Sequence, residues 1–165
     1  MKRFSDLPAI VLGPLEGRPD PDWYQAPPGK WSPAQIVEHL ALALEGCADG
    51  FEKRRARDPM FRRRLTGLER AGKLLVMHLG WFPPFLTAPS MTTPAPRVDR
   101  GAAESHFRRG VERIEELARL LLPARARDLF VKHPGLGDLT LPEWLEFHVI
   151  HSRHHARQIR SRLRR

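Results

Sequence analysis

Proline and glycine divide this sequence into stretches, and that division most constrains what the chain can fold into. Sixteen prolines and twelve glycines among 165 residues cluster between stretches of regular apolar spacing. The first strong stretch begins at WSPAQIVEHL, where Ser32 is placed as an N-cap, Pro33 fits the first turn and Gln35 completes a capping box. Apolar side chains then follow at helical spacing: Ile36, Leu40, Ala43, Leu44, Cys47 and Phe51.

The same reasoning predicts three more helices. One covers about 65–79 and must stop at GWFPPF, because its two prolines forbid continuation. Another covers about 102–122, with Pro123 marking its end. The last begins at the second capping box, Thr140-Leu141-Pro142-Glu143, and continues to the basic C-terminus. The proline-rich first 30 residues leave room only for a short helix near 6–15.

Strands are not predicted, because no stretch shows convincing alternation and HPGLGDL is interpreted as a turn. The pattern is all-α, with no internal repeat and no sign of a second domain. We therefore expect one helical domain over residues 1–165, a length that suffices to bury a core.

Composition narrows the class of protein. The net charge of +9 could mark an anionic partner, but no nucleic-acid-binding signature is present, and the run from Lys53 to Arg64 is interrupted by Pro59. Nucleic-acid binding is therefore not expected as the main function. The lone Cys47 cannot form an internal disulfide, and neither a signal peptide nor an apolar run of ~20 residues is seen. These features predict a cytoplasmic protein that does not span a membrane.

A pair of histidines carries the clearest chemical pattern. His151 and His155 lie four residues apart on the last predicted helix, so both rings can converge on one ion. His148 shares the core face, and His39 is half-turned toward the core of the first strong helix. The alternative is that each ring is a core residue satisfied by a neighbour. Three protein ligands with an open fourth position are typical of a catalytic metal site. Cys47 is interpreted as a core residue and not as a fourth ligand.

The spacing is similar to HExxH, but Ser152 stands where zinc proteases carry a glutamate base. Glu38 and Glu146 are predicted to point away from the site. A peptidase is therefore disfavoured. A metal that activates a thiol or a water by lowering its pKa remains open.

Three motifs together resemble the DinB-like superfamily: WSPxxIxxHL, HPxxGxLTxxEWLxFHxxH and HxxHHxxQI. The resemblance implies a four-helix bundle of up-down-down-up topology, here with a short or irregular first helix because of the early prolines. It implies one divalent metal ion, zinc or nickel, held by His39, His151 and His155, and it leaves His148 out. Some relatives transfer low-molecular-weight thiols, and relatives often pair, so the resemblance also implies a small-molecule substrate and a homodimer.

Two functions follow as hypotheses. The first is a metal-dependent thiol transferase or hydrolase. The second is a non-enzymatic bundle with a structural or vestigial metal that binds a partner through its basic surface. Of the other candidates, Trp31 and Trp144 are interpreted as core anchors, His133 as a residue that shapes its turn, and GWFPPF as an apolar lip or a dimer contact.

Overall fold

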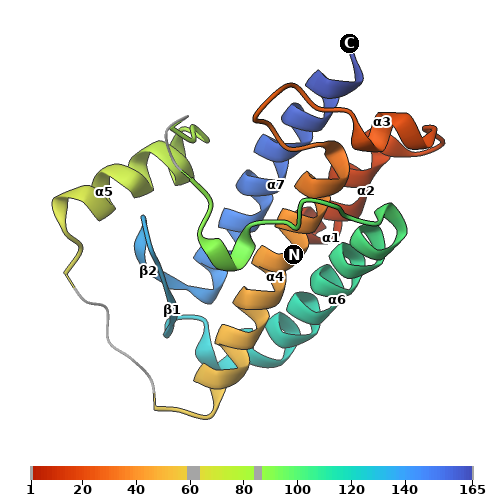
Figure 1. Cartoon of the computed structure of the whole chain (residues 1–165). Coiled ribbons are helices and arrows are strands. Elements are labelled where there is room, and N and C mark those ends of the chain that lie inside the picture. The colour runs from red at the N-terminus through yellow and green to blue at the C-terminus, as the bar shows by residue number, and fades with distance from the viewer. Residues whose placement is uncertain (1, 59–63, 84–86, 165) are drawn as a thin grey trace.

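The computed structural model describes residues 2–58, 64–83 and 87–164 and is mostly helical, as the sequence predicts (Figure 1). Part of the basic run after Lys53 and the last two residues of GWFPPF lie outside the described residues. The helices are α1 (Lys2–Ser5), α2 (Leu7–Leu12), α3 (Asp20–Tyr24), α4 (Pro33–Arg55), α5 (Gly67–Lys73), α6 (Arg100–Arg125) and α7 (Leu141–Leu163). Two 3-10 turns, Gly13–Leu15 and Ser90–Thr92, and a π-helical turn, Leu74–His78, complete the helical segments.

Both predicted capping boxes are present. At the start of α4 the Ser32 hydroxyl accepts from the Gln35 N–H at 3.3 Å, and the Gln35 side chain accepts from the Ser32 N–H at 3.0 Å. Thr140 and Glu143 repeat this arrangement at the start of α7. Because these side chains satisfy the first free N–H groups, they fix where the two helices begin.

The helices α4, α6 and α7 pack on one another, and α2 lies against α6 and α7 (Figure 1). The predicted apolar stripe of α4 is buried apart from Ala43, which is partly exposed. The stripe of α6 is buried as well: Phe107, Val111, Ile114, Leu117, Ala118 and Leu121. The close approach of α4 and α6 is made at Gly110, where an added Cβ would lie 3.0 Å from the Leu44 Cβ. Burial of these apolar faces is the main stabilising contribution.

The end predicted for the helix over about 102–122, which is α6 in the structure, was wrong by a few residues. Pro123 does not terminate α6, which continues to Arg125. Proline removes a backbone donor and crowds the carbonyl four residues earlier, but Pro123 lies in the last turn, where few bonds remain to be lost.

The prediction of no strands was also wrong. Residues Leu129–His133 (β1) and Gly137–Thr140 (β2) pair as an antiparallel hairpin, with His133 opposite Gly137. The strands are too short for a clear alternation, and the pairing is irregular between Leu129 and Val131. The turn itself follows the prediction, because the His133 Nδ1 accepts from the N–H groups of Gly135 and Leu136 at 3.1 and 3.2 Å. The hairpin lies beside α4 and leads directly into α7.

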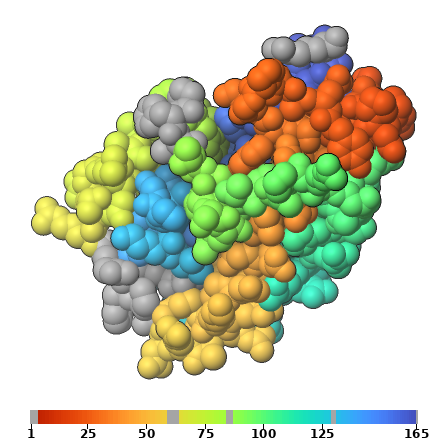
Figure 2. All heavy atoms as spheres, viewed as in Figure 1, coloured from red at the N-terminus to blue at the C-terminus, as the bar shows by residue number. Residues whose placement is uncertain are grey.

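The segment between α5 and α6 wraps around the helices. The π-helical turn extends α5 to His78, close to the predicted end, and contacts α7. Residues 87–99 then cross α4, as the green spheres of Figure 2 show. Among the residues that the structure describes, no helix combines the length and apolar character that a membrane crossing requires.

Candidate metal centre

Two helices bring three histidine side chains together. His39 lies on α4, between the buried Ile36 and Leu40, and is 5% exposed. His151 and His155 lie one turn apart on the buried face of α7 and are 9% and 7% exposed. Since α4 packs on α7, the three predicted metal ligands meet in the interior.

Two of the three distances between their ring nitrogens are close to those between ligands of one ion. The His151 Nε2 lies 3.3 Å from the His39 Nε2 and 3.0 Å from the His155 Nε2. One ligand atom from each of the three residues can be chosen so that all lie within 4.8 Å of one another. Tetrahedral zinc with Zn–N bonds of about 2.0–2.1 Å places its nitrogens about 3.3–3.4 Å apart. The three residues therefore lie close enough to hold a metal ion.

Hydrogen bonds on the opposite side of two rings fix which nitrogen is free. The His39 Nδ1 lies 2.7 Å from the Thr92 carbonyl oxygen, which can only accept, so this nitrogen carries the hydrogen. The His155 Nδ1 lies 2.9 Å from the Gln158 Oε1, which likewise can only accept. In both neutral rings the Nε2 lone pair consequently points toward His151.

The ring of His151 cannot donate a hydrogen bond to both of these Nε2 lone pairs. The His151 Nε2 can donate at most one hydrogen, whereas two Nε2 acceptors face it. Its Nδ1 is buried and has no hydrogen-bond partner among the described residues. A cation at the common point would bind all three lone pairs at once, so the donor set fits a divalent metal better than it fits a closed hydrogen-bond network.

Burial keeps these rings neutral. Desolvation lowers the pKa of His39, partly opposed by its hydrogen bond to Thr92. Desolvation, together with the neighbouring His155 and His39, holds the pKa of His151 well below its usual range. Desolvation and then the neighbouring His39 and His154 lower the pKa of His155 to about 3. Neutral imidazole is the form that binds a metal, so no proton has to be displaced from these rings near neutral pH.

His148, which the residue pattern alone could not exclude, lies outside this group. It is fully buried on α7 and packs against the rings of Phe4, Trp144 and Phe147. Burial lowers its pKa to about 3, so it is a neutral core residue. The prediction for Trp144 as a core anchor is confirmed too, because its indole N–H donates to the Val131 carbonyl at 2.9 Å.

Aromatic rings surround the three histidines. The ring centroid of Trp31 lies 4.8 Å from that of His39, and Phe147 stacks on His151 at 5.2 Å. Phe82, from the GWFPPF segment, lies 5.6 Å from His151. Trp31 thus packs against the core, as predicted, and also lies beside a candidate ligand. Phe82 brings the GWFPPF segment against the cluster.

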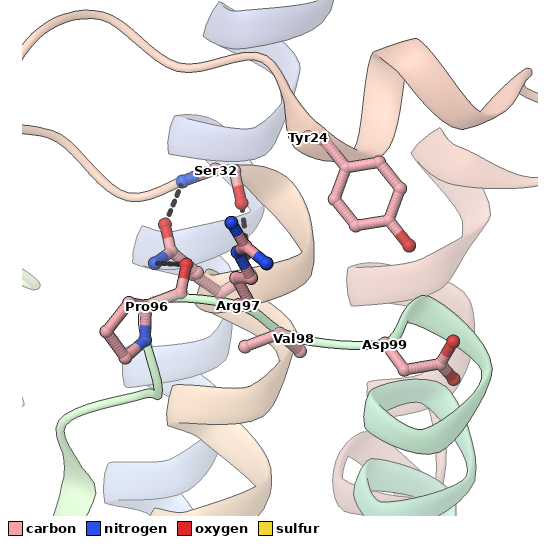
Figure 3. Close-up of a pocket in the computed structure, with 7 residues that line it drawn as sticks. Tyr24, Ser32, Pro96, Arg97, Val98 and Asp99 are labelled. Atoms are coloured by element: carbon pink, nitrogen blue, oxygen red, sulfur yellow. Dashed lines mark hydrogen bonds between the residues drawn. The ribbon is translucent and has the colours of Figure 1, made fainter.

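The carboxylate of Glu38 points away from the three histidines, as predicted. Both of its oxygens lie 3.3 Å from the His106 Nδ1, and the His106 Nε2 lies 3.4 Å from Glu45. These residues line a surface groove between α4 and α6. A second groove, of about 480 Å³, lies at the start of α4 and is bordered by Tyr24, Ser32 and the 96–99 segment (Figure 3). Neither groove is lined by any of the three clustered histidines.

Sequence reasoning missed the groups that orient the ligands. The carbonyl of Thr92 could not be foreseen, since it comes from a proline-rich loop without periodicity. Gln158 carried a signal: it lies three residues after His155 and hence on the same side of the helix.

One comparison with known proteins gives a match. The model of a family described as "Protein of unknown function (DUF1569)" matches residues 21–162, and the chain belongs to this family. Neither the curated proteins nor the solved structures give a significant match.

Proposed function

We propose that this member of the DUF1569 family holds one divalent metal ion at His39, His151 and His155 and uses it in an enzymatic reaction on a small molecule. The observation that carries the proposal is the convergence of three Nε2 atoms, two of them with lone pairs fixed by hydrogen bonds. Imidazole ligands suit zinc and nickel, which we propose as the metals.

The proposed chemistry is thiol transfer, with hydrolysis as the second form. A metal bound by three neutral imidazoles lowers the pKa of a thiol or water in its open position, which makes that ligand a nucleophile near neutral pH. The protein supplies the surroundings: Trp31, Phe82 and Phe147 exclude water, which strengthens electrostatic interactions inside the site.

Several features favour a thiol over the peptide bond as the reactant. The metal-ligand group found among the described residues contains no carboxylate, and Glu38 is held by His106. A thiol needs no strong protein base once it is bound to a metal, because its pKa is lowered directly. The motif resemblance to the DinB-like superfamily, with its four-helix bundle and its thiol-using members, supports the same proposal.

The second candidate is a partner-binding protein in which the metal is structural or vestigial. The observation in its favour is a basic face on α7, where Arg153, Arg157 and Arg160 are exposed and are followed by the exposed Arg164 just after the helix. Their spacing places them along one side of the helix. Such a face would bind an acidic partner in a salt-dependent manner.

Metal analysis of the purified protein separates the two candidates. We expect one equivalent of zinc or nickel in the wild-type protein and in a control, His78→Ala, which changes an exposed histidine outside the cluster. His39→Ala should lose the metal. If the variant then melts near the wild-type temperature, a structural metal is excluded and a functional site is favoured; if metal loss unfolds the protein, the structural candidate is favoured.

Activity is tested by a screen of low-molecular-weight thiols with monochlorobimane. Metal-dependent conjugation by the wild-type protein and by His78→Ala, but not by His39→Ala, is the expected result. Conjugation that is absent with every thiol, in a protein shown to carry its metal, would contradict the transferase proposal.

A further inference from the structure

Of the two hydrogen-bond partners that orient metal ligands, one is a backbone carbonyl and the other is a side chain. Thr92 orients His39 through its carbonyl oxygen, whereas Gln158 orients His155 through its amide. A mutation can therefore remove the second interaction without moving the backbone.

The amide of Gln158 is held at both ends. Its Oε1 accepts from the His155 Nδ1 at 2.9 Å, and its Nε2 donates to the His154 Nε2 at 3.0 Å. Gln158 is partly exposed, and so is His154, whose ring packs against Phe82 at 4.7 Å between centroids. The amide thus connects the buried ligand to a histidine near the protein surface.

The orientation of this amide decides which tautomer His155 adopts. With the oxygen toward His155, the ring carries its hydrogen on Nδ1 and its Nε2 lone pair faces His39 and His151. If the amide were turned over, its NH₂ group would face Nδ1, and the hydrogen would have to move to Nε2, where it would block metal binding. The donor contact to His154 holds the amide in the orientation that suits a metal.

We infer that Gln158 is a positioning residue of the metal centre, which fixes His155 in the Nδ1–H tautomer and is itself oriented by His154. This inference rests on the proposed metal site and adds a residue to it. Partners of this kind contribute about 10–100-fold to metal affinity where they have been removed.

The test compares three variants of the full chain. Gln158→Met keeps the length of the side chain but offers no comparable acceptor. Gln158→Glu keeps an acceptor, and a carboxylate can hold only the Nδ1–H tautomer. Arg160→Met makes the same kind of change at an exposed position of α7 and serves as the control.

Zinc affinity is measured by competition with a chromophoric chelator, and the geometry is read from the visible bands of the cobalt-loaded proteins. We expect wild-type affinity for Arg160→Met, a loss of about 10–100-fold for Gln158→Met and restored affinity for Gln158→Glu. The cobalt bands should shift in Gln158→Met alone. The metal-free proteins should melt at similar temperatures, since a merely structural role would lower the melting temperature instead.

The outcomes distinguish the inference from the function on which it rests. Equal zinc affinity and identical cobalt spectra for wild type and Gln158→Met would overturn the inference and leave the metal site standing. A wild-type protein that binds neither zinc nor cobalt would overturn both.

Discussion

Acid should weaken this fold in part through one ring in the β1–β2 turn. The His133 Nδ1 accepts two backbone hydrogen bonds, and the ring packs against Phe147 at 4.6 Å between centroids. Protonation of Nδ1 would remove both bonds and place a charge against an aromatic surface. Burial accordingly lowers the pKa of His133 to about 4.

The sign and size of the effect follow from proton linkage. An unfolded histidine titrates near pH ~6.5, so below that value the unfolded chain binds more protons than the native protein. The stabilising contribution of neutral His133 is thus complete above pH ~6.5 and is lost as the pH falls toward about 4. With these two pKa values, the loss between pH 8 and pH 5 is about 2 kcal/mol.

The assay is urea unfolding of metal-free protein at both pH values, for the wild type and for His133→Asn. The asparagine oxygen can accept the same two N–H groups but does not titrate. The other buried histidines are present in both proteins, so their contributions cancel except for the smaller part of the His148 shift that His133 itself causes. Between pH 8 and pH 5, we expect the free energy of unfolding to fall by about 2 kcal/mol less in the variant than in the wild type. An equal fall in the free energy of unfolding of the two proteins would refute the reasoning.

Three further predictions concern the glycine turn, a helix cap and the metal. Gly137 has φ +71°, and an added Cβ would lie 2.6 Å from Leu65. Gly137→Ala should therefore lower the free energy of unfolding in urea by at least about 1–2 kcal/mol. Gly135→Ala, with open space around the added Cβ, should be close to neutral in the same titration. Thr140→Ala should lower the free energy of unfolding by about 1 kcal/mol through loss of the α7 cap; an unchanged urea midpoint would contradict the assigned cap. Zinc at about a hundredfold excess over its Kd should add about 2.7 kcal/mol to the stability of the wild type but not of His151→Ala, as measured by thermal unfolding with and without metal.

Local signals in the sequence predicted much of this fold. Ser32 and Thr140 mark helix starts because a hydroxyl followed three residues later by an amide or a carboxylate satisfies the free N–H groups at that point. The buried stripes of α4 and α6 follow from apolar spacing alone. The three ligands were likewise accessible, since two lie one turn apart on the same helix and His39 lies beside an apolar stripe.

Other features depend on tertiary context, which local patterns do not encode. The hairpin was missed because strands of four or five residues carry little alternation, and their pairing depends on α4 and α7 beside them. Phe82 reaches His151 only because the chain turns after the π-helical segment. The topology of the bundle and the reaction itself stay predictions.

The distance along the chain between the ligands gives the cluster one more property. His39 and His151 are 112 positions apart, whereas His151 and His155 are neighbours within α7. Closing a loop of that length costs an unfolded chain on the order of 4 kcal/mol of entropy, which the packing of α4 on α7 has already offset in the native protein. An isolated α7 peptide therefore carries only two of these three ligands, and only the folded protein brings His39 to them. Tight metal binding at this cluster would itself report that the whole domain has assembled.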